Sequence, residues 1–252
     1  MNRQLEREIN ELEKIEQEEL GKMLLIGGKE ARFIVGGSMT DLNRQCYEQE
    51  LEMISMPQLF KKRVENGVDS DLGRLLWKYD ILTDSNLGRV EYKERDYGLF
   101  THLNIFGTEE NKIQAYQRPL RTGGIEVTSN DIDRAISMED GTNVIIAPFQ
   151  TIRNSPRGKI SLRDILKGDG HAVAKGASGN DLELLEQYLM NYLKIMKKSP
   201  FNPLEIGIWF SEDAGVNTMR PLELGDSGIG IYNRNLTNKL YRTIGIKKPQ
   251  PF

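Results

Sequence analysis

The stretch LGRVEYKERDYGLFTHLNIF, residues 87–106, decides the fold class of this 252-residue chain. Two strand-like runs, Leu87–Lys93 and Gly98–Phe106, flank a polar turn, and β-branched and aromatic residues between turn residues predict strands. Working outward, the same pattern predicts further strands at Ala115–Leu120, Ile125–Thr128, Asn143–Ala147, Ala31–Val35, Leu204–Phe210 and Ile229–Tyr232.

Helices are expected on both sides of this strand-rich middle. Before it, helical spacing predicts helices at about 41–55, at Gln58–Asn66 and at Asp71–Tyr79. Short helices are expected at about 130–138 and 161–167, and a long one at 181–198, which Asn180 would cap. Because helices and strands do not alternate strictly, we predict an α+β fold: an N-terminal helical segment followed by a mainly antiparallel sheet with packed helices.

Composition excludes several classes of protein. The mass is 28.8 kDa, charged residues make up 28%, and the net charge of −3 gives an isoelectric point near 5.7. These values are those of a globular chain, not of a fibre or a disordered protein, and they lack the basic excess of a nucleic-acid coat. The single cysteine, Cys46, favours a reducing interior, so we expect a cytoplasmic location during assembly. No apolar run suggests a membrane partner.

The two ends of the chain are the expected contact regions. Residues 1–24 predict a helical arm with a narrow apolar seam, which gains stability only by packing on something else. We divide the chain into this arm, a single α+β core at 25–245 and a tail at 246–252. The arm can dock on its own domain or on a neighbouring subunit, and the predicted oligomer interface consists of Leu5, Ile9, Leu12 and Phe252.

Basic residues cluster late in the chain, with tyrosines between them. Cations interleaved with aromatic rings suit contact with nucleic acid or with an acidic partner, and a solvated surface is the alternative. The cluster could also pair with the acidic N-terminal arm of another subunit, a contact that salt would weaken. Its members are Arg234, Lys239, Arg242, Lys247 and Lys248.

The sequence contains few candidate ligands for a metal ion or a cofactor. His102 lies in an apolar strand and is expected to be structural, whereas His171 lies in a glycine-rich loop, Gly168–Asn180. One cysteine and two histidines cannot supply the four ligands of structural zinc. The glycine loop does not match a phosphate-binding motif, so its role stays open. We expect no metal and no cofactor.

One carboxylate pattern suggests an enzyme. Asp80 precedes the run Glu91-Tyr92-Lys93 by a short turn. This arrangement resembles the core of the PD-(D/E)xK nucleases, an aspartate followed by E-x-K on a strand. The resemblance implies a Mg²⁺ ion held by Asp80 and Glu91, with Lys93 assisting the attack on phosphorus. Ion pairing across a hairpin is the alternative interpretation.

These observations favour a structural protein over an enzyme. We expect a non-enzymatic subunit of a homo-oligomeric assembly, such as a phage head–tail connector, collar or tail protein of a virion. Its partners would be copies of itself and other structural proteins. The alternative is a nucleic-acid protein, either a nuclease using Asp80, Glu91 and Lys93 or a viral nucleoprotein using the late basic cluster.

Overall fold

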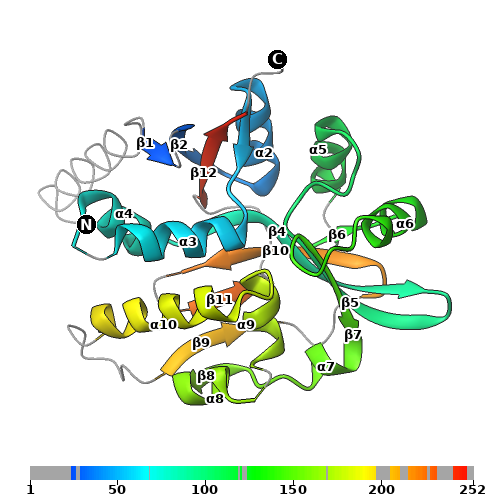
Figure 1. The fold of residues 1–252 in the computed structure, drawn as a ribbon. Helices are drawn as coiled ribbons and strands as arrows, with labels where there is room; N and C mark the ends of the chain where they lie inside the picture. Colours follow the sequence, from blue (N-terminus) through cyan, green and yellow to red (C-terminus); the bar gives the residue numbers. More distant parts are fainter. Residues whose placement is uncertain are drawn as a thin grey trace, which may run out of the picture.

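The computed structural model describes residues 24–26, 29–67, 69–118, 120, 124–168, 170–196, 205–210, 215–225, 228–231 and 241–248. The described strands form two sheets (Figure 1). The smaller sheet is antiparallel throughout, and its four strands lie in the order β1 (Leu24–Ile26), β2 (Lys29–Gly36), β12 (Tyr241–Lys247) and β3 (Leu51–Met53).

The larger sheet carries the β4–β5 hairpin between its edge strand β7 and its middle strand β10. Its described pairings are antiparallel except for β9 with β11, and the short strand β6 (Ile125–Glu126) pairs with β10 outside the main path. The main strands lie in the order β7 (Val144–Pro148), β5 (Arg95–Thr101), β4 (Ile81–Tyr92), β10 (Thr218–Leu224), β11 (Gly228–Ile231), β9 (Glu205–Trp209) and β8 (Gly158–Ser161).

Helices cover both sheets. Helix α2 (Met39–Glu48) packs on the smaller sheet and against α5 (Glu109–Gln117), while α3 (Met56–Asn66) packs on α4 (Asp71–Lys78) and α10 (Leu182–Met196). The other described helices are α6 (Ser129–Ser137), α7 (Phe149–Arg153), α8 (Leu162–Leu166) and α9 (Ala172–Ala177). Among the helices described, none is both long and apolar enough to cross a membrane.

Strand β4 lies between two apolar cores. Its odd-numbered residues Ile81 and Leu87 belong to one core, and its even-numbered residues Leu82 and Val90 belong to the other. Successive side chains of a strand point to opposite faces, so one strand can serve both cores. At Gly88 a Cβ would lie 2.3 Å from the carbonyl oxygen of Thr218, so this close approach of β4 to β10 requires glycine.

A buried imidazole joins segments on one side of β4. The Nε2 atom of His102 lies 2.9 Å from the carbonyl oxygen of Gly176, which can only accept, so Nε2 carries the proton. Nδ1 then accepts from the Ser85 hydroxyl at 2.7 Å, and Ser85 Oγ accepts from the Met56 amide, also at 2.7 Å. His102 is therefore a neutral, structural histidine, and burial lowers its pKa to about 4.

The predicted fold class is confirmed, because the structure is α+β with mainly antiparallel sheets. Several elements begin and end close to their predicted positions, since the residues that cap them are visible in the sequence. Ser55 and Thr128 cap α3 and α6 in capping boxes, and Ser161 caps α8.

Other local predictions were wrong. Residues 115–117 end helix α5 instead of beginning a strand, because Thr108 accepts a hydrogen bond from the Asn111 amide and starts the helix earlier. The helix predicted to reach residue 55 ends at Glu48, and β3 follows. Asp181, not Asn180, accepts the capping hydrogen bond at α10, from the Leu184 amide.

The predicted division of the chain differs from the structure at both described ends. Leu24, assigned to the arm, begins β1, and Ile246 and Lys247, assigned to the tail, belong to β12. The tail boundary was placed too early because the last residues of β12 precede a proline and include a lysine at the exposed end of the strand. The helical arm itself lies outside the described residues, as do Leu5, Ile9, Leu12 and Phe252.

The buried imidazole makes stability depend on pH in a specific window. The pKa of His102 is lower in the folded protein than its ordinary value, so the unfolded chain binds a proton first as the pH falls. We expect the free energy of unfolding to drop by about 2 kcal/mol more between pH 7 and pH 5 in the native sequence than in His102→Gln. Urea unfolding at both pH values measures this difference. An equal loss of unfolding free energy from pH 7 to pH 5 in the two proteins would contradict it.

Candidate ligand-binding pocket

The three residues of the nuclease pattern do not converge. Asp80 directly precedes β4 and Glu91 is its penultimate residue, so extended backbone separates their Cα atoms by roughly 36 Å. Lys93 lies beyond Glu91 in the hairpin turn, with φ of 48°. No group of three or more His, Cys, Asp or Glu side chains within the described residues is placed to hold a metal ion. The Mg²⁺ site implied by the resemblance is therefore absent from this part of the chain.

Some residues of the late basic cluster form contacts within the chain. The Arg242 guanidinium carbon lies 4.5 Å from the centre of the Tyr79 ring, and Lys247 Nζ lies 3.2 Å from Glu30 Oε2. Lys248 follows β12 and donates its main-chain N–H to the Glu50 carbonyl. Arg234 and Lys239 lie outside the described residues. The structure thus gives Arg242 and Lys247 intramolecular contacts, and their contact with nucleic acid or an acidic partner stays a prediction.

The glycine-rich segment that contains His171 is not a continuous loop. Residues 172–177 form α9, and His171 caps this helix by accepting from the Ala174 amide. The other ring nitrogen lies 2.7 Å from the carbonyl oxygen of Pro156. His171 is buried, so its imidazole has a structural role and its pKa is lowered by desolvation.

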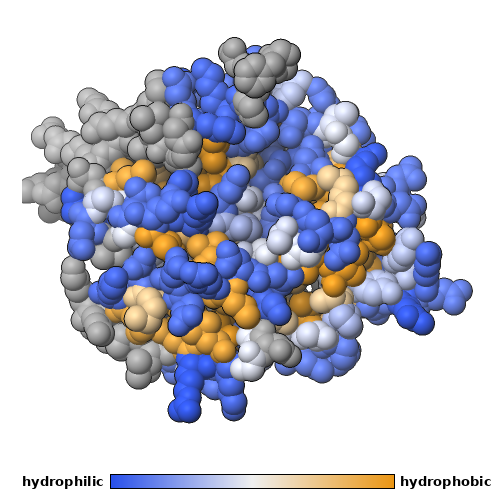
Figure 2. Space-filling view, viewed as in Figure 1, coloured by the Kyte–Doolittle hydropathy of each residue, from blue (hydrophilic) through white to orange (hydrophobic). Residues whose placement is uncertain are grey.

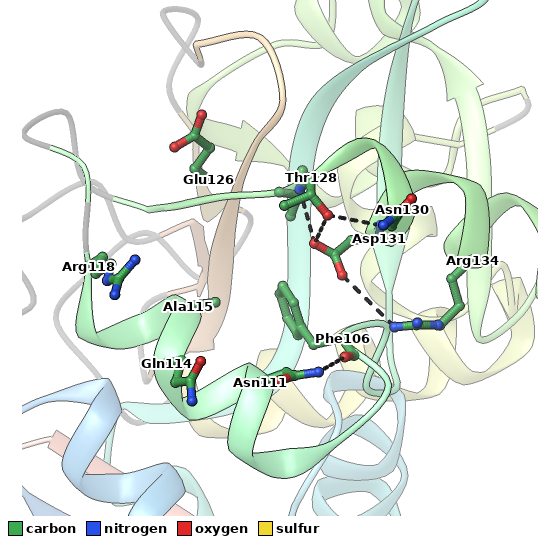
Figure 3. Close-up of a pocket in the computed structure, with 11 residues that line it drawn as sticks. Phe106, Asn111, Gln114, Ala115, Arg118, Glu126, Thr128, Asn130, Asp131 and Arg134 are labelled. Carbon is green, nitrogen blue, oxygen red and sulfur yellow. Dashed lines mark hydrogen bonds and ion pairs between the residues drawn. The ribbon is translucent and has the colours of Figure 1, made fainter.

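A different feature stands out as a site: an open pocket of about 460 Å³ between α5, β6 and α6 (Figure 3). Pockets of this volume accommodate ligands of moderate size. Most of the residues that line it are polar, and the apolar ones form a floor. The lining residues are Phe106, Asn111, Gln114, Ala115, Arg118, Glu126, Val127, Thr128, Asn130, Asp131 and Arg134.

Helix α5 forms one wall because two buried polar contacts fix its orientation. The Lys112 ammonium is buried and forms an ion pair with Asp84 of β4. One turn further along, the Tyr116 hydroxyl donates to Asn86 Oδ1 at 2.7 Å. The remaining face of the helix then points at the pocket through Asn111, Gln114 and Ala115, which have the i, i+3, i+4 spacing of one helical face, and Arg118 follows as the C-cap residue.

The first turn of α6 forms a rigid second wall. Thr128 and Asp131 make a reciprocal capping box: Thr128 Oγ1 accepts from the Asp131 amide, and Asp131 Oδ2 accepts from the Thr128 amide at 3.0 Å. Arg134 donates to the carbonyl of Ile105 at 2.9 Å and lies 3.9 Å from Asp131. These groups hold one another, as the dashed lines in Figure 3 show, and so they shape the pocket.

Four exposed side chains on the pocket wall form no side-chain hydrogen bond or ion pair within the described part of the chain. They are Gln114 of α5, Arg118 at its C-cap, Glu126 of β6 and Asn130 in the first turn of α6. Figure 3 shows Arg118 and Glu126 at the same end of the pocket, with Gln114 further along α5. Two amides, one cation and one anion are thus available to a ligand, beside an apolar floor formed by Phe106 and Val127. This arrangement can bind a polar ligand through several hydrogen bonds.

The sequence did not indicate this pocket. Arg118 was assigned to a strand at Ala115–Leu120 and Gln114 to no element, which hid the helix that carries this wall. The available signal was Thr108 followed by Glu109 and Glu110, a typical helix start. Glu126 could not have been found in this way, because its place opposite α5 depends on the pairing of β6 with β10.

A smaller cavity of about 260 Å³ lies behind α5 and is lined by buried ionisable groups. Lys112 is held there by Asp84 and lies 3.8 Å from Glu109. Burial raises the pKa of Asp84, and Lys112 acts in the opposite direction. The Lys112 cation is thus paired within the chain, and this ion pair holds α5 against β4.

Comparison with known proteins shows the fold. No protein-family model matches the sequence, and no curated protein matches it significantly. A solved structure with the C-type lectin fold matches with a TM-score of 0.71 over 88% of this chain and 99% of that chain. That protein, at 16% identity, belongs to work on how the C-type lectin fold accommodates massive sequence variation in Nanoarchaeota. The present chain therefore resembles the C-type lectin fold, which is likewise α+β.

The two walls of the pocket should respond differently to mutation. Thr128→Ala removes the cap of α6 and should lower the free energy of unfolding by about 1 kcal/mol. Gln114→Ala removes an uncommitted side chain and should change it by less than about 0.5 kcal/mol. Urea unfolding checks both values, and a Gln114→Ala loss as large as that of Thr128→Ala would show that Gln114 is structural.

Proposed function

We propose that this chain is a non-enzymatic structural protein that recognises a macromolecular partner within a homo-oligomeric assembly. The pocket between α5 and α6 carries this proposal. Its rigid wall is internally bonded, whereas the exposed side chains of Gln114, Arg118 and Glu126 form no hydrogen bond or ion pair with the residues that the structure describes. Polar groups held on fixed elements and left without partners are suited to binding.

The structural neighbour supports a scaffold role. Its C-type lectin fold is described as accommodating massive sequence variation, which requires a frame that stays folded while its surface changes. We extend this idea to the present chain as a constant two-sheet frame that presents a recognition surface. The pocket is then one part of that surface.

An apolar surface supports self-association. Leu182 and Met190 are exposed on α10, eight residues apart and so near one helical face, and Leu166 is exposed on the neighbouring helix α8. Figure 2 shows apolar side chains reaching the surface in the lower part of this view, where α8, α9 and α10 lie. Exposed apolar side chains that lie close together favour contact with another protein surface.

We propose a virion as the setting, with the chain as a phage head–tail connector, collar or tail protein. Its partners would then be copies of itself and other structural proteins. The buried free thiol of Cys46 is compatible with assembly in a reducing cytoplasm.

Recognition by the pocket can be tested by photocrosslinking. We expect benzoylphenylalanine at position 114, on the pocket wall, to cross-link one macromolecular partner in the cells that naturally produce the protein. Arg118→Gln in the same chain should reduce the yield, because it removes the guanidinium beside the probe, whereas Arg153→Gln on distant α7 should not. The same probe at Gln150, exposed on α7 and away from both the pocket and α10, is the positional control. Cross-links at 114 that match those at 150 and ignore Arg118→Gln would contradict recognition by the pocket.

Assembly can be tested by the native mass of the untagged full chain. We expect light scattering to give a multiple of the 28.8 kDa monomer. Leu182→Ser with Met190→Ser should shift the protein toward the monomer, because it removes the exposed apolar face of α10. Val216→Ser, at another exposed apolar residue, is the matched control. A monomer at every concentration and salt level would overturn the assembly part of the proposal.

A further inference from the structure

An open sheet edge borders the pocket. Among the described strands, β6 pairs with β10 alone. The Val127 amide donates to the Asn217 carbonyl at 2.9 Å, and residues alternate along an antiparallel ladder, so Glu126 occupies the next, non-hydrogen-bonded position. The main-chain N–H and C=O of Glu126 therefore point away from β10. They offer one donor and one acceptor on the edge of the strand that lines the pocket.

The side chains around this edge offer a complementary set of groups. Gln114 both donates and accepts, Arg118 only donates, and the Glu126 carboxylate only accepts. An extended polypeptide carries one donor and one acceptor at each residue, so it can satisfy the strand edge and α5 at the same time. The pocket floor is apolar at Phe106 and Val127. Because alternate side chains of a strand share one face, such a segment would place one apolar side chain on this floor.

The charge of the pocket argues for a polypeptide over a nucleic acid. Arg118 is offset by Glu126, and Arg134 by Asp131, so the pocket has no excess of positive charge. Nucleic-acid binding depends on neutralising phosphates with cations, and two carboxylates would oppose it. A polypeptide with little net charge needs no excess of cations in the pocket and is not repelled by the two carboxylates.

We propose that the pocket binds an extended polypeptide segment of a partner protein as a short extra strand beside β6, with Arg118 and Gln114 of α5 contacting its other edge. This inference rests on the proposed function and names the class of partner. Addition of a strand to an open sheet edge is a common mode of peptide recognition, in which main-chain hydrogen bonds give affinity and alternate side chains give specificity. The edge of β6 is short, so specificity should come largely from the apolar residue on the pocket floor.

The test uses the full-length chain and a phage-displayed library of linear peptides. A selected peptide, synthesised with a fluorescent label, is titrated by fluorescence anisotropy. We then methylate its main-chain nitrogens one at a time, which removes one donor at each position. We expect about tenfold weaker binding at the residue whose N–H faces Glu126, a loss no larger than this at the two adjacent residues, whose N–H groups face α5, and little change at residues beyond the pocket.

Substitutions in the protein complete the design. Arg118→Gln should weaken binding by about tenfold, because it removes a charged hydrogen-bond donor. Arg153→Gln should leave the affinity unchanged, because α7 does not line the pocket. Circular dichroism verifies that each variant is folded.

The outcomes separate this inference from the proposed function. Equal losses at every methylated position, or no effect of Arg118→Gln, would overturn strand addition in this pocket. If no peptide is selected while the probe at position 114 still cross-links a partner, recognition stands and the polypeptide class is wrong. A nucleic acid or a glycan as the cross-linked partner would also overturn the inference. Failure of both the selection and the cross-linking would remove the proposed function itself.

Discussion

The hydrogen bonds of the His102 imidazole are the constraint on which much of this fold depends. They connect the segment after β5 to Ser85 of β4 and to Gly176 of α9, and Ser85 in turn fixes the first residue of α3. The position of α9 leaves no room for a side chain, since a Cβ on Gly176 would lie 2.4 Å from the Phe100 ring. A buried polar group of this kind is stable only when every partner is present, so the four segments must take their places together.

The same strand carries this constraint to the pocket. Ser85 lies between Asp84 and Asn86, and these two neighbours hold α5 through Lys112 and Tyr116. Three successive residues of β4 thus determine where the core packs and how α5 is oriented. The contacts with β4 thus hold the α5 wall of the pocket in place, although none of these three residues lines the pocket. The Ile54 main chain adds a further link, accepting from Asp84 of β4 and donating to Ile244 of β12, so the two sheets are fixed to each other at the same place.

The sequence allowed prediction of the elements that are determined by neighbouring residues, but not of those that depend on contacts between distant parts of the chain. Helices α6 and α8 and the β4–β5 hairpin could be predicted because their caps and turns are written in adjacent residues. Helix α9 could not be predicted, since it requires glycine at position 176 only because the ring of Phe100, distant in sequence, packs against that position. The pocket was hidden for the same reason: Arg118 and Glu126 lie at the same end of the pocket only because α5 is tied to β4 and β6 is paired to β10. The E-x-K pattern illustrates the converse error, because the turn expected between Asp80 and Glu91 is continuous strand.

The division of roles among polar groups is the strongest physical argument about function. Folding normally consumes buried polar groups in hydrogen bonds, and both histidines, the Lys112–Asp84 pair and the α6 cap follow this rule. A side chain that contributes nothing to folding is free to change without loss of the fold. Gln114, Arg118 and Glu126 are of this kind, and they lie together on a wall that the folded core holds rigid. A stable frame that carries replaceable side chains in one place can alter what it recognises at little cost in stability, and that property is what a recognition surface requires.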